Sequence, residues 1–430
     1  MMTTKGESAP RRADVAAYGA VTAAYWAFML SDGALRMLVL LHFHTLGFSP
    51  LTLAYLFVLY EIAGIITNLG AGYIAARLGL RFTLFTGISA QVLALIALAQ
   101  LDQNWAIGAS VAYVMAVQGA SGVAKDLAKM SAKSAVKLLA PQAGATLFRW
   151  VALLTGSKNA VKGLGFLIGA ALLSAAGFQG ALLSMAAALA LVLGTVAALM
   201  PAGLPAGRKG TKFAQVFSTS HNVNWLSLAR VFLFGARDIW FVVGVPVYFQ
   251  TVLSDGSSDG NRTAFFLVGG FMASWVIFYG MIQAAAPKLL GAANRSTASL
   301  MAGAKTWAIA LCALLGTLTL GISAIPASDG PAPALFSTFG RTELLISGLM
   351  LFAAVFALNS ALHSYLILAF SKDDRVTMDV GFYYMANAAG RLLGTLLSGL
   401  SFSMGGLTLC LATATAFTAI SAWAAGKLRP

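Results

Sequence analysis

Residues 15–44 read VAAYGAVTAAYWAFMLSDGALRMLVLLHFH and form one continuous apolar run. About 20 apolar residues suffice for a helix to cross the hydrocarbon core of a bilayer, so this stretch predicts a transmembrane helix. Two charged residues, Asp32 and Arg36, nevertheless lie inside the run. A charged side chain at the bilayer centre costs about 2.5–3.5 kcal/mol even on permissive scales, and such a residue is a functional hypothesis by default.

The whole chain has the composition of a membrane protein. Of its 430 residues, 59% are hydrophobic and 10% are charged, whereas soluble domains carry roughly 25% charged residues. Two cysteines and the lack of low-complexity tracts exclude disulfide scaffolds, collagen-like chains and disordered chains. The alternating ten-residue segments of a membrane barrel are absent. The predicted fold class is therefore an all-α bundle of membrane helices.

Twelve apolar runs are long enough to span a membrane. They cover residues 15–44, 51–75, 82–101, 105–124, 147–174, 179–200, 223–253, 263–285, 298–324, 342–370, 378–400 and 406–426. Residues 1–14 do not resemble a signal peptide and are expected to be a cytosolic leader. With both termini in the cytosol, most Lys and Arg residues outside the spans are cytosolic, as the positive-inside rule requires. The net charge of +14 is thus interpreted as a topology signal, and no nucleic-acid partner is expected.

A long polar segment divides the chain between the sixth and seventh spans. It separates an N-terminal six-helix half, a cytosolic linker and a C-terminal six-helix half: residues 1–200, 201–222 and 223–430. The halves also match weakly in sequence. At an offset of 206 residues Asp32 falls on Asp238, and at an offset of 229 Lys162 falls on Arg391. Such matches are expected of two halves related by an axis along the membrane normal.

The loop after the second predicted span reads GYIAARLGLR, residues 72–81. Its spacing of glycine, arginine, glycine and arginine resembles the loop signature of the major facilitator superfamily. The resemblance implies twelve helices in two pseudo-symmetric halves. Ala76 stands where that signature usually has aspartate, so no charge-paired gate is carried over to this chain.

Five cations deep inside predicted spans are the candidate substrate-binding residues: Arg36, Lys158, Lys162, Arg237 and Arg391. Two amides are predicted to add neutral hydrogen bonds, Asn159 and Asn387. Three acids at similar depth are predicted to balance charge or carry protons: Asp32, Glu61 and Asp238. The excess of two positive charges favours a small molecule with several negative charges, and the planar arginine fork suits phosphate or arsenate oxygens. Structural ion pairing is the alternative, and it is the favoured interpretation for Arg230.

Two pairs of neighbouring charges give further expectations. Asp32 and Arg36 share one helix face, so we expect them to pair across one turn. Arg237 and Asp238 point roughly 100° apart on a helix, so we do not expect them to neutralise each other fully.

A basic stripe follows the fourth span, where a lysine recurs at every fourth residue: Lys125, Lys129, Lys133 and Lys137. One interpretation is a cytosolic face that contacts anionic lipid. The other is an electrostatic funnel that concentrates an anion at the cytosolic entrance, with Lys125, Lys129 and Lys133 as its residues.

The remaining reactive residue types indicate no metal, cofactor or catalytic site. The four histidines are scattered; those in the spans could carry a proton but are expected to be structural: His42, His44 and His363. Cys312 and Cys410 are far apart in the sequence, which argues against a soft-metal or trivalent-arsenic carrier. No paired carboxylates, metal-ligand spacing or nucleophile motif supports an enzyme.

Four longer stretches resemble the ArsJ family of organoarsenical efflux permeases: DGALRMLVLLHFH (32–44), GVAKDLAKMSAKS (122–134), LTGSKNAVKG (154–163) and FGARDIWF (234–241). The resemblance covers nearly the whole chain. It implies export of 1-arseno-3-phosphoglycerate across the bacterial inner membrane by alternating access, and hence arsenate resistance. It also implies a functional pairing with a glyceraldehyde-3-phosphate dehydrogenase, which makes this ester from arsenate. The alternative is a proton-coupled major facilitator transporter for another organic phosphate or a drug.

Overall fold

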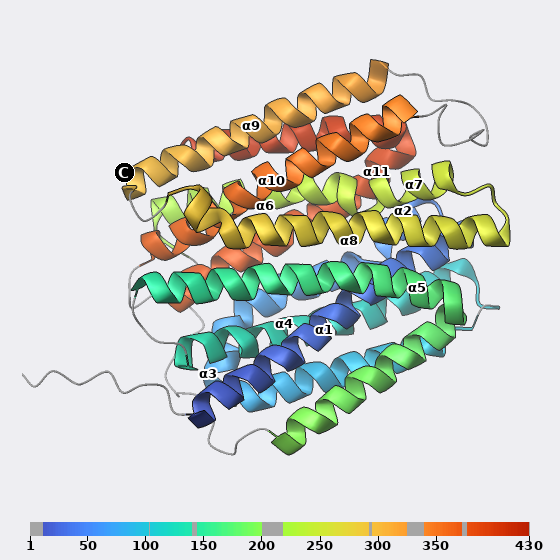
Figure 1. The fold of residues 1–430 in the computed structure, drawn as a ribbon, viewed down its shortest axis with the longest axis horizontal. Coiled ribbons are helices and arrows are strands. Elements are labelled where there is room, and N and C mark those ends of the chain that lie inside the picture. Colours follow the sequence, from blue (N-terminus) through green and yellow to red (C-terminus); the bar gives the residue numbers. More distant parts are fainter. Residues whose placement is uncertain are drawn as a thin grey trace, which may run out of the picture.

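Long helices that run side by side make up most of the described part of the computed structural model (Figure 1). It describes residues 12–102, 104–139, 144–199, 218–291, 295–324, 339–371 and 376–429. In chain order the elements are α1 (Arg12–Thr45), α2 (Pro50–Tyr55), α3 (Val58–Ala99), α4 (Ile107–Leu139), α5 (Gly144–Leu199), α6 (His221–Ile239), η2 (Trp240–Gly244), α7 (Val245–Leu253), α8 (Ser258–Leu289), α9 (Thr297–Ala324), α10 (Phe339–Phe370) and α11 (Val376–Ala425). No strand occurs among the described residues, and the predicted all-α class is confirmed.

Ten stretches of the described residues are long and apolar enough to cross a membrane. Two of them, Gly156–Ala198 in α5 and Asp379–Ala425 in α11, are about twice the length that one crossing requires. α5 turns at Gly177 (φ 67°) and α11 at Gly406 (φ 59°), a backbone conformation that glycine adopts without steric cost. Figure 1 shows α5 reversing direction. Each of these helices therefore supplies two of the twelve predicted spans. Gly177 lies in the gap between its two predicted spans, and Gly406 is the first residue of the last one.

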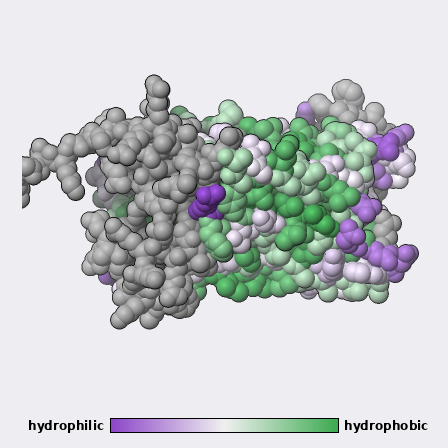
Figure 2. Space-filling view, turned by 90° about the horizontal axis from the view of Figure 1, so that it is seen from below, coloured by the Kyte–Doolittle hydropathy of each residue, from purple (hydrophilic) through white to green (hydrophobic). Residues whose placement is uncertain are grey.

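The surface has the pattern of a lipid-facing protein. Figure 2 shows hydrophobic residues across the middle of the visible face and hydrophilic residues at one end of it. Together with the ten apolar spans, this pattern makes the chain a multi-pass membrane protein. The start of α1 and the C-terminus lie at the same end of the bundle (Figure 1). That this end faces the cytosol stays a prediction.

Two features of the sequence analysis lie outside the described part of the chain. They are most of the linker, at residues 200–217, and the side chains of residues 71–80, which include nearly all of the loop motif.

Two helix pairs that contain the buried charges pack by the same device. α1 packs along α5, and α6 packs along α11. Gly165 of α5 lies directly against the α1 backbone, and a Cβ atom at Gly394 of α11 would lie 2.6 Å from the carbonyl oxygen of Gly235. Only glycine allows so close an approach, as in other membrane helix pairs. Gly165 and Gly394 are separated by the offset that aligns Lys162 with Arg391, so these cations occupy matching places in the two pairs.

The helix that follows the charged residues of α6 is interrupted by the π-helical turn η2. Pro246, just beyond it, has no N–H group, and its ring would clash with the carbonyl group four residues earlier in a regular helix. The wider turn accommodates the proline. Ser398 Oγ of α11 accepts hydrogen bonds from the backbone N–H groups of Val243 (3.1 Å) and Gly244 (3.2 Å). These bonds hold η2 against α11, just beyond the charged residues of α6.

Candidate functional site

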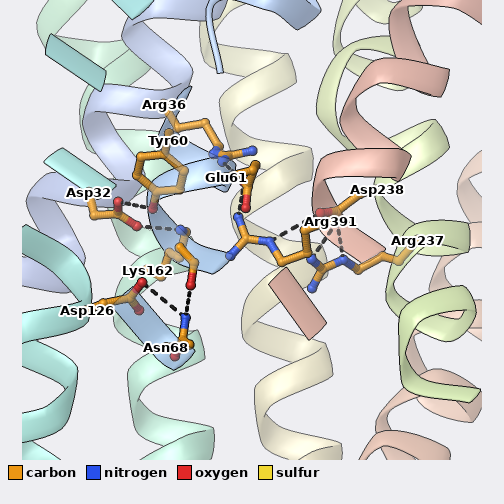
Figure 3. Close-up of polar contacts among 11 residues, drawn as sticks. Asp32, Arg36, Tyr60, Glu61, Asn68, Asp126, Lys162, Arg237, Asp238 and Arg391 are labelled. Carbon is orange, nitrogen blue, oxygen red and sulfur yellow. Dashed lines mark hydrogen bonds and ion pairs between the residues drawn. The ribbon is translucent and has the colours of Figure 1, made fainter. Parts of the chain in front are cut away.

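Most of the predicted buried charges meet at one place between α1, α3, α4, α5, α6 and α11 (Figure 3). We define this central cluster by nine residues: Asp32, Arg36, Tyr60, Glu61, Lys125, Lys162, Arg237, Asp238 and Arg391. Its members stand far apart in the sequence, and the bundle brings them into a continuous series of contacts.

Asp32 on α1 is the acceptor of the first acid–cation pair. Its Oδ2 accepts a hydrogen bond from Lys162 Nζ at 2.5 Å, and its Oδ1 accepts one from the Tyr60 hydroxyl at 2.5 Å. A buried carboxylate is tolerated when it is paired and hydrogen-bonded in this way. Arg36 bonds to Glu61 instead. The expected Asp32–Arg36 pair is therefore wrong, because each side chain finds its partner on another helix.

Asp238 on α6 repeats this arrangement. Its Oδ2 accepts from Arg391 Nε of α11 at 3.3 Å, and its Oδ1 accepts from Arg237 Nε at 2.6 Å. The angle of roughly 100° between Arg237 and Asp238 does not keep them apart, because the long arginine side chain reaches back to its neighbour. The same acid–cation contact thus occurs once between α1 and α5 and once between α6 and α11, at the two offsets found in the sequence.

Glu61 on α3 joins the two arrangements. Its Oε1 accepts hydrogen bonds from Arg36 Nη2 at 2.8 Å and from Arg391 Nη2 at 2.6 Å. The carboxylate is fully buried, and its Oε2 has no hydrogen-bond partner among the described residues. Removing one member of a buried pair leaves an uncompensated charge, at a cost of about 3–5 kcal/mol. The Glu61–Arg391 contact therefore holds α3 firmly to α11.

Lys125 on α4 adds a cation without a carboxylate partner. Its Nζ lies 4.0 Å from the centroid of the Tyr60 ring, in cation–π contact, and the side chain is buried. Among the described residues no ion pair includes Lys125. The cluster has five cations, Arg36, Lys125, Lys162, Arg237 and Arg391, and three carboxylates, Asp32, Glu61 and Asp238. The excess of two positive charges equals that counted from the sequence, although Lys125 takes the place of Lys158.

Lys129, one turn beyond Lys125, belongs to a separate pair. Its Nζ donates to Asp126 Oδ1 at 3.0 Å and to Asn68 Oδ1 at 2.5 Å. Lys125 and Lys129 thus point into the bundle, which contradicts a lipid-facing stripe at these two positions; the side chain of Lys133 lies outside the described residues. Asp126 was missed in the sequence because it stands among surface-like lysines. Its position three residues before Lys129, a spacing at which helical side chains pair, was the available signal.

The two predicted amides lie outside the central cluster. Asn159 Nδ2 on α5 donates to Gln283 Oε1 on α8 at 2.8 Å. Asn387 Oδ1 on α11 accepts from Arg230 Nε on α6 at 2.9 Å. Lys158, next to Asn159, is half-buried and lies one turn before Lys162.

Both amides belong instead to a second polar site around Arg230. Structural ion pairing was the interpretation of this arginine from the sequence. Ser360 of α10 is at its centre: its Oγ accepts from Arg230 Nη1 at 3.1 Å and from Gln283 Nε2 at 3.2 Å, and it lies 3.3 Å from the Tyr279 hydroxyl. We define the Arg230 group by six residues: Asn159, Arg230, Tyr279, Gln283, Ser360 and Asn387. All partners of the arginine in this group are neutral.

Side chains that hold metals or act as nucleophiles are not gathered in the described part of the chain. No three His, Cys, Asp or Glu side chains there lie close enough to share a metal ion. Cys312 and Cys410 are both free, and the His42 ring stacks on Phe178 with 4.0 Å between centroids. What the central cluster provides is surplus positive charge beside three carboxylates.

Comparison with solved structures identifies the fold. One match is a POT family transporter in complex with 5-aminolevulinic acid, 14% identical over 94% of each chain, with a TM-score of 0.67. Another is a D-xylose-proton symporter, 11% identical over 97% of each chain, with a TM-score of 0.69. Comparisons with protein-family models and with curated proteins give no match. The resemblance to these transporters is one of architecture, and the chain has the major facilitator fold.

Proposed function

We propose that this protein exports 1-arseno-3-phosphoglycerate, a small and multiply charged phosphate ester, by alternating access. The observation that carries the proposal is the excess of two positive charges in the central cluster. The identity of the cargo rests on the resemblance to the ArsJ family. The four stretches with that resemblance contain six of the nine cluster residues: Asp32, Arg36, Lys125, Lys162, Arg237 and Asp238.

Recognition follows from the surplus charge. Two negative charges on a ligand neutralise the cluster, and phosphate or arsenate oxygens accept bidentate hydrogen bonds from arginine. Lys125 has no carboxylate partner among the described residues, so its ammonium group is available to such a ligand. Arg36 and Arg391 share a single oxygen of Glu61, and each keeps donors for further acceptors.

The transport step is a rocking of the N-terminal half, residues 1–200, against the C-terminal half, residues 223–430, about the central cluster. Glu61 and Arg391 come from different halves, so their ion pair stabilises the conformation of this structure, in which α3 contacts α11. A ligand oxyanion competes with Glu61 for Arg391 and weakens this contact. Binding thereby favours the change of state, as differential affinity requires.

In the cell, the two termini and the linker face the cytosol, and the protein lies in the bacterial inner membrane. A glyceraldehyde-3-phosphate dehydrogenase supplies the ester, and its removal confers arsenate resistance. Exit of an anion from a cell that is negative inside is favoured by about 2.3 kcal/mol per charge per 100 mV. Proton coupling through Glu61 is the alternative energy source, and another organic phosphate is the alternative cargo.

The test uses everted membrane vesicles that contain this protein. They receive glyceraldehyde 3-phosphate, NAD, arsenate and purified dehydrogenase, and arsenic uptake is followed. We expect uptake only when the dehydrogenase is present. Equal uptake without the enzyme identifies an inorganic-oxyanion carrier and contradicts the proposal.

Two controls complete this test. Vesicles without the protein report leakage. Replacing arsenate with radiolabelled phosphate makes the corresponding bisphosphate ester, and uptake of the label without any uptake of arsenic would assign the protein to another organic phosphate.

A further inference from the structure

Arg230 is a buried arginine whose partners are all neutral. Its residue is 5% exposed. The guanidinium donates to Asn387 Oδ1 at 2.9 Å, to Ser360 Oγ at 3.1 Å and to the Ser360 carbonyl oxygen at 3.3 Å. Among the described residues it makes no ion pair, and its Nη2 makes no hydrogen bond. Because a guanidinium keeps its charge in proteins, this site has affinity left for an anion.

Two more polar side chains of α10 have no hydrogen-bond partner among the described residues. Asn359 directly precedes Ser360, His363 follows it by three residues, and both are 0% exposed. Both amide atoms of Asn359 and both ring nitrogens of His363 make no hydrogen bond with the described residues. An orphaned buried polar group costs about 1–3 kcal/mol, and in a native structure it calls for an explanation such as a ligand or water. Four polar atoms without partners among the described residues therefore lie on the same helix as Ser360, which contacts a cation that has no carboxylate partner there.

This region is within reach of the central cluster. Arg230 and Arg237 are seven residues apart on α6, which is about two helix turns, so they share a face. The Phe234 ring lies between them, with its centroid 3.8 Å from Arg230 Cζ and 4.9 Å from Arg237 Cζ. The two guanidinium carbons are thus no farther apart than the sum of these distances. This separation is within the length of a short molecule with a charged group at each end.

We infer that Arg230 forms a second anion subsite, which binds one charged end of the transported molecule while the central cluster binds the other. The inference rests on the proposed function. It assigns a separate binding site to each charged end of the cargo, which is a short carbon chain with an oxyanion at each end. Asn387 and Ser360 orient the guanidinium fork. Asn359 and His363 supply neutral hydrogen bonds to the same end of the ligand.

The test compares two commercial probes on the purified full-length protein. 3-Phosphoglycerate has a phosphate and a carboxylate at opposite ends of three carbons, whereas glycerol 3-phosphate has a neutral hydroxyl in place of the carboxylate. We expect the wild-type protein to bind 3-phosphoglycerate at least about tenfold more tightly, the size of one charged hydrogen bond. Arg230→Gln removes this preference and leaves the affinity for glycerol 3-phosphate unchanged. Binding is measured by isothermal titration calorimetry.

Three controls make the result decisive. Arg262→Gln, at an exposed arginine, keeps the preference. If Arg230→Gln does not fold, Arg230→Lys takes its place, because lysine retains the positive charge but lacks the planar guanidinium. We then expect a reduced preference for 3-phosphoglycerate over glycerol 3-phosphate. Inorganic phosphate is the third probe: binding as tight as that of 3-phosphoglycerate overturns the inference, since it reports an independent site for a single anion.

An unchanged preference in Arg230→Gln also overturns the inference, as does an equal loss for both probes. The result is separate from the identity of the cargo, because no arsenic is involved. A protein that fails to take up the arsenic ester but prefers the two-ended probe keeps the subsite and loses only the proposed cargo.

Discussion

Arg391, which is half-buried, and Arg230, which is buried, both lie at the contact of α6 with α11, yet their partners are of opposite kinds. Arg391 lies between the carboxylates of Glu61 and Asp238, at 2.6 Å and 3.3 Å. Arg230 lies between a serine and an amide. A cation between two carboxylates is neutralised without a ligand and holds helices together. A cation with neutral partners keeps its attraction for an anion. We propose that the same residue type stabilises one state of the protein at Arg391 and binds an anionic ligand at Arg230.

The largest effect is expected from removing Arg391, the arginine that pairs with two carboxylates. Arg391→Ala should abolish arsenate resistance of cells that carry the protein with its dehydrogenase, because the substitution removes both a binding group and the contact to Glu61. The protein should still be found in the membrane fraction by immunoblotting. Arg262→Ala, at an exposed arginine, is the matched control and should keep full resistance. Retained resistance in Arg391→Ala would count against a role in transport.

Glu61→Gln tests the charge of the same contact without changing its size. Arg36 and Arg391 then lose their shared carboxylate, and we expect a destabilisation of roughly 3–5 kcal/mol. The measurement is the temperature at which the detergent-solubilised protein loses its monodisperse peak in size-exclusion chromatography. Glu61→Asp, which keeps the charge, should recover part of the loss. If Glu61→Gln were as stable as the wild type, the contact between Glu61 and Arg391 would not be what holds α3 to α11.

The fold was predictable because a bilayer constrains it so strongly. Apolar length alone located the helices. The turn at Gly177 fell in a gap between predicted spans, and the turn at Gly406 fell at the start of the last predicted span. The offsets that align Asp32 with Asp238 and Lys162 with Arg391 indicated matching positions in two halves, but they did not predict that α1 packs along α5 and α6 along α11. We did not predict the interruption at η2, although Pro246 just beyond it was an available signal; the hydrogen bonds of η2 to Ser398 depend on a distant helix and were not predictable.

The sequence predicted which charged residues lie in the central cluster better than it predicted which of them pair with each other. Intramembrane charges are costly wherever they occur, so the sequence alone identified Asp32, Glu61 and Arg391. Their partners depend on which helix faces are apposed, and a single sequence favours near neighbours such as Arg36 for Asp32. For the same reason Lys125 was interpreted as part of a basic stripe that either contacts anionic lipid or forms the cytosolic entrance, because helical spacing does not say which side of α4 is covered.

Lys125 and Lys129 offer a milder test within a single helix. Lys125→Met should weaken binding of 3-phosphoglycerate about tenfold, or ~1.4 kcal/mol, without loss of thermal stability, because Lys125 makes no ion pair among the described residues. Lys129→Met should instead lower stability, because Asp126 loses its cation. Titration calorimetry and thermal unfolding of the two variants, side by side, check this contrast. Identical behaviour of the two would contradict it.

The smallest effect is expected at the neutral contact of the Arg230 group. Asn159 of α5 and Gln283 of α8 share a 2.8 Å hydrogen bond, which also joins the N-terminal and C-terminal halves. Neutral hydrogen bonds contribute about 0.5–1.5 kcal/mol, so Asn159→Ala should lower thermal stability far less than Glu61→Gln does. If the two losses were equal, charge would not be what distinguishes the central cluster, and the difference between Arg391 and Arg230 would have to be sought in packing.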